Sequence, residues 1–84
     1  SKIADGERYL QNLGMRECRL RHHGNIARIE VDGKGMSLLL NGQIRQDLVK
    51  QIKALGYTYV TLDLGGYRSG SLNEELDKDI EGRK

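Results

Sequence analysis

Two arginines one residue apart are the side chains of this 84-residue sequence that most clearly could do chemistry. Arg19 and Arg21 lie in the segment CRLRHHG, and Gly24-Asn25 is a two-residue hairpin signal. Such a loop pairs Arg21 with Arg28 and Arg19 with Glu30. Directly opposed like charges destabilise a sheet, so the Arg21–Arg28 pair needs a nearby negative charge. A bound phosphate is one candidate, because guanidinium groups match phosphate oxygens in bidentate pairs.

Alternation along the hairpin separates two faces of the predicted sheet. The apolar face holds Cys18, Leu20, Ile29 and Val31, with His22 and Ala27. The other, which we call the arginine face, holds Arg19, Arg21, Arg28 and Glu30. Two interpretations stay open at this stage: a solvated outer surface with a cross-strand Arg19–Glu30 ion pair, or a surface that captures phosphate.

Other candidate residues carry weaker signals. Cys18 and His22 point to the apolar face while His23 points away, which argues against a zinc site and for Cys18 as a small packed hydrophobe. The loop 65–71, GGYRSGS, could present amides, hydroxyls and Arg68 to an anion. It lacks the Lys-Ser/Thr ending of a P-loop, and turn chemistry explains its small residues equally well.

Composition narrows the classes of function. A chain this short is one domain with a marginal core, so association with more protein would help it. No apolar run approaches the roughly 20 residues of a membrane span, and the single cysteine fits a reducing compartment, so we expect a cytoplasmic location and no membrane partner. Residues 1–73 carry 11 bases and seven acids. That mild excess suits one phosphate-sized ligand and not a nucleic acid polymer.

The elements that must position these side chains follow from periodicity and caps. We expect helices over 2–13 and within 37–55 and strands over 17–23, 26–32 and 57–64, with residues 36–40 as a possible separate turn. The stretch DGKG at residues 32–35 is expected to be a connection. The S-x-x-E spacing of Ser71 and Glu74 predicts a short helix over 72–80. The fold class is α+β: a small two-layer sandwich of about three strands with two main helices on one face, in the order α-β-β-α-β.

The two helix-to-strand units repeat at an offset of 42 residues. LGM at residues 13–15 matches LGY at 55–57, so Gly14 and Gly56 both stand where a helix takes a left-handed C-terminal cap. Duplication and similar packing demands both explain the match. The offset places Val60 and Leu62 beside Cys18 and Leu20. It also turns Tyr59, Thr61 and Asp63 toward the arginine face.

Two stretches resemble a known family. RLRHHG with IARIEV, and LGYTYVTLDL running into GYRSGSLN, are similar to the C-terminal domain of LarE-type ATP-dependent sacrificial sulfur transferases. The similarity covers roughly residues 2–75, including the helix KIAxxExYL. We therefore expect residues 1–75 to be a LarE-like α+β domain and residues 76–84 a charged variable tail.

The resemblance implies a role in building the nickel-pincer nucleotide of lactate racemase. In that family an N-terminal PP-loop domain uses ATP and Mg²⁺, and members form symmetric oligomers. By motif, Arg19 and Arg21 would contact phosphate of a nucleotide substrate, and Arg28 and Arg68 belong to the same phosphate-binding prediction. Glu7 and Glu30 would be metal-associated acids. A further acid that some relatives place after the second strand has no counterpart here.

The sequence has no PP-loop, and the segment with the sacrificial cysteine would lie upstream of residue 1. We expect a substrate- and phosphate-binding and oligomerisation domain with no catalytic residue of its own. As a fragment it would not be an enzyme and would hold no tightly bound cofactor. Its partners would be the PP-loop domain and further copies of itself. The alternatives are a free-standing anion- or nucleotide-binding regulatory module and a pure oligomerisation domain.

Overall fold

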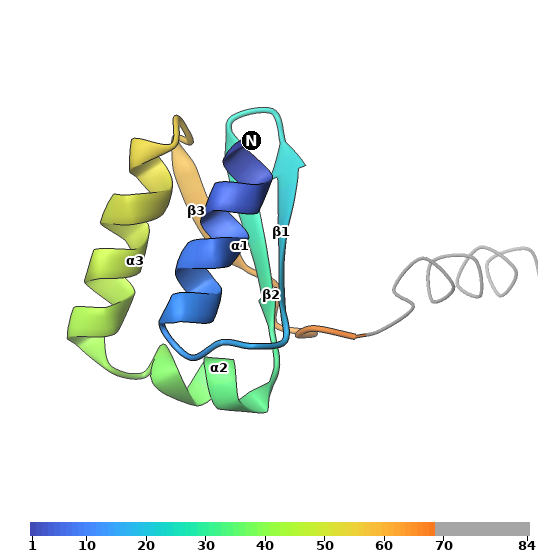
Figure 1. The fold of residues 1–84 in the computed structure, drawn as a ribbon, viewed down its shortest axis with the longest axis vertical. Helices are drawn as coiled ribbons and strands as arrows, with labels where there is room; N and C mark the ends of the chain where they lie inside the picture. The colour runs from blue at the N-terminus through green and yellow to red at the C-terminus, as the bar shows by residue number, and fades with distance from the viewer. Residues whose placement is uncertain (69–84) are drawn as a thin grey trace, which may run out of the picture.

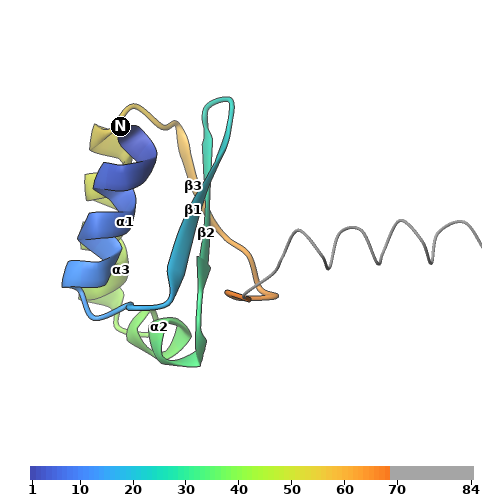
Figure 2. The ribbon, with the colours of Figure 1, turned by 45° about the vertical axis from the view of Figure 1, so that its right-hand side comes forward.

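The computed structural model describes residues 1–68, which form three helices and a three-stranded sheet (Figure 1). The elements in chain order are α1 (Lys2–Asn12), β1 (Cys18–His23), β2 (Ile26–Val31), α2 (Gly33–Leu38), α3 (Gly42–Ala54) and β3 (Tyr59–Leu62). Helices α1 and α3 lie on one face of the sheet (Figure 2). The predicted α+β sandwich is confirmed, with α2 as an additional short helix.

Local signals define the ends of the two main helices. The Ser1 hydroxyl accepts a hydrogen bond from the Ala4 amide at 3.2 Å, and the Asn41 side chain accepts one from the Ile44 amide at 3.1 Å. Gly14 and Gly56 follow the helix ends with φ of +106° and +111°. The predicted left-handed caps are therefore confirmed.

The sheet has the order β1-β2-β3, with β2 in the centre. Strands β1 and β2 are antiparallel, and the predicted register is confirmed: Arg21 pairs with Arg28 and Arg19 with Glu30. Strand β3 runs parallel to β2, as the crossover through α2 and α3 allows. Val60 and Leu62 pack against the core that holds Cys18 and Leu20, as expected. They are not on an adjacent strand, however, because β3 pairs with β2 and sets Val60 opposite Ala27 and Leu62 opposite Ile29.

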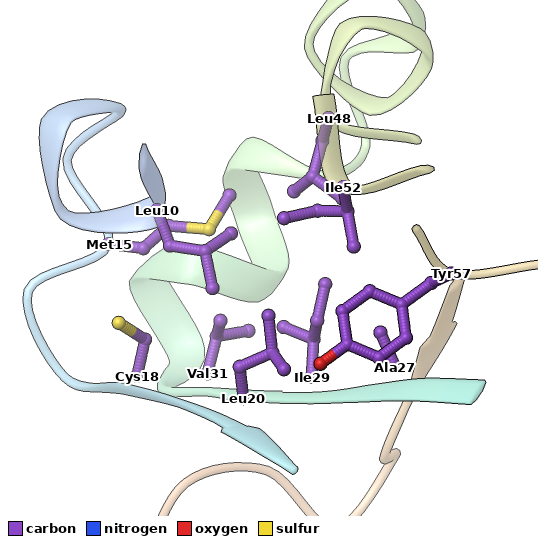
Figure 3. Close-up of a cluster of buried hydrophobic side chains, with 10 residues drawn as sticks. All are labelled: Leu10, Met15, Cys18, Leu20, Ala27, Ile29, Val31, Leu48, Ile52 and Tyr57. Carbon is purple, nitrogen blue, oxygen red and sulfur yellow. The ribbon is translucent and has the colours of Figure 1, made fainter. Parts of the chain in front are cut away.

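The core lies between the sheet and the two long helices (Figure 3). Leu10 of α1 and Ile52 of α3 are fully buried and point toward the sheet residues Leu20 and Ile29. The buried set is Leu10, Met15, Cys18, Leu20, Ala27, Ile29, Val31, Leu48, Ile52 and Tyr57. The apolar face predicted from alternation is confirmed. His22 also lies on it, in contact with the buried Tyr57, although His22 is exposed at the hairpin end.

Helix α2 occupies a stretch that the sequence pattern predicted as a connection. The Asp32 carboxylate accepts a hydrogen bond from the Gly35 amide at 2.9 Å and so caps the helix. Gly35 is buried, and a Cβ atom there would come within 2.6 Å of the Val31 Cβ. The glycine therefore permits the close approach of α2 to the end of β2.

After β3 the chain passes to the side of the sheet opposite α1 and α3 (Figure 2). Within residues 1–68, no helix covers that side. No helix in this part of the chain is long and apolar enough to cross a membrane. The helix predicted over 72–80, its capping box and the tail 76–84 lie outside the described residues.

Candidate functional site: the arginine face

The arginine face is organised around a buried carboxylate. Glu30 is only 5% exposed, and its Oε2 atom lies 3.3 Å from Arg28 Nη2 and 3.6 Å from Arg21 Nε. The two guanidiniums belong to directly opposed residues of β1 and β2. The negative charge that this opposed pair needs is thus supplied, at least in part, by the protein itself.

The Arg19–Glu30 ion pair of the solvated-surface interpretation does not form among the described residues, although the two residues are register partners. The Glu30 carboxylate lies instead with Arg28 on its own strand and with Arg21 on the diagonal. The exposed Arg19 guanidinium lies over the ring of Tyr67, 5.9 Å from its centroid. Within residues 1–68, no carboxylate lies at ion-pair distance from Arg19.

Tyr67 is positioned by the loop that follows β3. Its amide donates to the Val31 carbonyl at 2.8 Å, which ties the loop to the end of β2. Gly66 precedes it with φ of +80°, and a Cβ atom at Gly66 would lie 3.0 Å from that same carbonyl. Sequence reasoning missed Tyr67 as a site residue, although an aromatic beside Arg68 in a glycine-rich loop was the available signal.

Strand β3 and the residue that follows it, Asp63, contribute further polar groups of the face. Asp63 Oδ2 lies 4.0 Å from Arg28 Nε, while its Oδ1 accepts from the Gly65 amide at 2.8 Å. The Thr61 hydroxyl donates to the Ala27 carbonyl at 3.1 Å. Arg68 follows Tyr67 directly and is exposed. The structure therefore brings Arg19, Arg21 and Arg28 together on one face and places Arg68 in the adjoining loop.

Glu7 lies elsewhere. It belongs to α1, on the other side of the sheet, and its Oε2 accepts a hydrogen bond from the Leu20 amide of β1 at 3.0 Å. This bond satisfies a backbone donor that points away from β2, at the edge of the sheet. Residues 1–68 contain no cluster of three or more potential metal ligands. Glu7 and Glu30 together do not fit a metal centre in this geometry, since they face opposite sides and Glu30 already contacts two cations.

Cys18 and His22 have structural partners. Burial, together with the nearby carboxylates of Glu7, Glu17 and Asp32, raises the pKa of the Cys18 thiol to about 11. A thiol with that pKa is a poor nucleophile at neutral pH. His22 Nδ1 and the Tyr57 hydroxyl form a hydrogen bond of 2.8 Å. Neither side chain adds chemistry to the arginine face.

An apolar hollow lies between α3 and β3, and none of Arg19, Arg21 and Arg28 lines it. Its volume is about 160 Å³. The lining consists of Ile29, Leu39, Leu48, Val49, Val60 and Leu62, with Arg45 and Thr61 as the polar members. Beyond β3 the sheet carries no further strand within the described residues.

Comparisons with known proteins extend this description. No protein-family model matches the chain. It is 41% identical over 80 residues, 93% of its length, to the pyridinium-3,5-bisthiocarboxylic acid mononucleotide synthase of Lactiplantibacillus plantarum. It is 38% identical over 77 residues to an uncharacterized protein of Synechocystis sp.. The chain spans 28% and 29% of the length of these relatives. The resemblance found in the sequence is thereby confirmed: nearly the whole chain is related to the C-terminal region of LarE.

Proposed function

We propose that this chain is the phosphate-binding C-terminal domain of a LarE-type sulfur transferase acting in nickel-pincer cofactor biosynthesis. In this role the arginine face holds the phosphate of a nucleotide substrate. The L. plantarum relative is named for a mononucleotide product, and a mononucleotide carries a phosphate. The parent protein would use ATP and Mg²⁺ in its PP-loop domain, in the cytoplasm, and this domain would supply binding groups and no reacting group.

The proposal rests chiefly on the surroundings of the Arg19 guanidinium. Arg21 and Arg28 already have Glu30 as a carboxylate partner. Arg19 is exposed and lies over the Tyr67 ring, with no carboxylate at ion-pair distance in residues 1–68. A guanidinium held by a ring keeps its hydrogen-bond donors available for phosphate oxygens. Arg19 is therefore the primary ligand in the proposal, with Arg21, Arg28 and Arg68 as supporting charges.

Pyrophosphate binding, measured by titration calorimetry, tests this role. Arg19→Ala removes one charge-assisted contact, worth about 1.5–3 kcal/mol or about 10- to 150-fold in Kd. Arg8→Ala is the matched control, because Arg8 is an exposed arginine on α1 that pairs with Asp5 at 3.6 Å. We expect the control to bind within about twofold of the parent. If both variants lost the same pyrophosphate affinity, the loss would reflect only the change in net charge, and the proposed site would be refuted.

A second function, self-association, is favoured by the open edge of β3. Val60 and Leu62 alternate with the residues whose amides bond to β2, so their own backbone groups point outward. The apolar hollow adjoins this edge, and Leu64, just beyond β3, is 86% exposed. A second copy of the chain pairing along β3 would cover these groups.

Sedimentation at several concentrations tests the association. Val60→Lys would place a charge beside the hollow and should shift the protein toward monomer. Lys50→Glu, an exposed charge change on α3, serves as a control and should leave the equilibrium unchanged. If the unsubstituted chain stayed monomeric at all concentrations, self-association through residues 1–84 would be refuted.

A further inference from the structure

Glu30 is a buried acid whose two oxygens have different surroundings. One oxygen, Oε2, lies at ion-pair distance from both Arg21 and Arg28. The other, Oε1, is buried and has no hydrogen-bond partner in the described part of the chain. The side chain is only 6% exposed, whereas those of Arg21 and Arg28 are each about one-third exposed, at 36% and 35%. A carboxylate is thus buried beneath two arginines that reach solvent.

The surroundings of Glu30 favour the arginine side chains of the protein over a bound metal ion as partners of the carboxylate. A divalent metal at Glu30 would have to approach between two guanidiniums 3.3 and 3.6 Å from the carboxylate, where like charges repel it. Without the carboxylate, the opposed Arg21 and Arg28 would repel one another and separate. The shared Oε2 atom therefore draws the two guanidiniums toward one point.

We propose that Glu30 is a positioning residue of the anion site: it holds Arg21 and Arg28 beside each other so that both can act on one phosphate together with Arg19. The proposal rests on the proposed phosphate-binding function. It assigns Glu30 to the arginines and not to a metal. The energetic benefit comes from preorganisation, because side chains already fixed lose less freedom when the ligand binds.

Three variants separate positioning from net charge. Glu30→Gln removes the charge at nearly constant size. Glu30→Asp keeps the charge but withdraws the oxygens by one methylene. Asp5→Asn, the matched control, makes the same change in charge as Glu30→Gln at an exposed carboxylate of α1 that pairs with Arg8 at 3.6 Å, on the other side of the sheet.

The proposal expects pyrophosphate affinity to fall about tenfold in Glu30→Gln, the size of one lost charge-assisted contact, and to fall also in Glu30→Asp. Asp5→Asn should bind equally well or up to about twofold tighter, because the net charge of the protein becomes more positive by one. A charge-only role predicts the opposite pattern: tighter binding in both neutralised variants and no change in Glu30→Asp. That pattern would overturn the proposal.

Arginine Nε–H signals in NMR spectra of the full chain provide a readout that does not need a ligand. The Arg21 and Arg28 signals should move toward those of free arginine in Glu30→Gln and Glu30→Asp but hold their positions in Asp5→Asn. Unmoved signals in all three variants would refute positioning. If the parent chain binds no pyrophosphate while these signals respond as expected, the phosphate-binding function fails and the positioning by Glu30 stands. A Mn²⁺ titration that is saturable in the parent and lost in Glu30→Gln would assign Glu30 to a metal and overturn the proposal.

Discussion

Replacing Gly35 by alanine should destabilise the protein, although alanine is the better helix former. The new Cβ would lie 2.6 Å from Val31 Cβ and 3.0 and 3.3 Å from its two methyl carbons. Carbon atoms in ordinary contact are about 3.5–4.0 Å apart, so α2 would have to move about 1 Å from β2. Val31 Cβ is bonded to the backbone and cannot rotate away. The cost exceeds the gain in helix propensity.

The magnitude follows from two opposing terms. Alanine gains about 1 kcal/mol over glycine in a helix, and overpacking of a tight core costs about 1–3 kcal/mol or more. Because the clash involves a β-branched residue at the backbone, we take the upper end and expect a net loss of about 2 kcal/mol. For a domain of this size that loss lowers Tm by about 8–16 °C.

Gly33→Ala in the same helix provides the control, because a Cβ there meets nothing within 4 Å. It should be neutral or stabilise by up to about 1 kcal/mol. Urea unfolding followed by circular dichroism measures both variants. A Gly35→Ala protein as stable as Gly33→Ala would refute the claim that α2 packs directly on Val31. Since the Val31 carbonyl also holds the Tyr67 amide, the same variant should weaken pyrophosphate binding.

Four further outcomes are expected. Cys18 should react with iodoacetamide at pH 8 at least about tenfold more slowly than after unfolding in urea, and incubation with ATP, Mg²⁺ and substrate should leave it free of dehydroalanine in mass spectra. The pKa of the Cys18 thiol, about 11 in the folded protein, exceeds the ordinary value of 9.0, so the thiol ionises first in the unfolded chain. The free energy of unfolding should therefore fall as pH rises from about 9 to 11. A free energy of unfolding that rose over that range would contradict the burial of the thiol. Glu7→Ala should lower the free energy of unfolding by about 1–3 kcal/mol, as it leaves the Leu20 amide without its partner, and Glu7→Asp should not restore it. Tyr57→Phe should cost about 0.5–1.5 kcal/mol through loss of the bond to His22, and a double variant with His22→Ala should show that the two losses are not additive.

The hairpin could be predicted in detail because its signals are local. Gly24-Asn25 defines the loop, and the period of two then determines every β1–β2 pair and the face of each side chain. The caps at Gly14 and Gly56 are local signals of the same kind. These parts of the fold depend on residues close in sequence.

The sheet order and the ion pairs could not be predicted in the same way. The 42-residue repeat relates β3 to β1 by similarity, but similarity does not say which strands are neighbours. Register fixes which backbone atoms meet, whereas a long arginine can reach a diagonal partner as easily as the opposite one. Arg19 lies over Tyr67 because of a loop some 45 residues further along the chain. The stretch DGKG at residues 32–35 was predicted as a connection, and its glycines are poor helix formers. In the structure, residues 33–35 begin α2, and the absence of a side chain at Gly35 allows this helix to pack on Val31.

A map of pyrophosphate binding by NMR tests the central claim most directly. Backbone and arginine side-chain signals of the full chain are followed as pyrophosphate is added. Binding at the arginine face predicts that the largest shifts occur at Arg19 and Tyr67, with smaller ones at Arg21 and Arg28, and that α3 is unaffected. Shifts centred on the basic residues of α3, or no saturable shift at Arg19, would contradict the account.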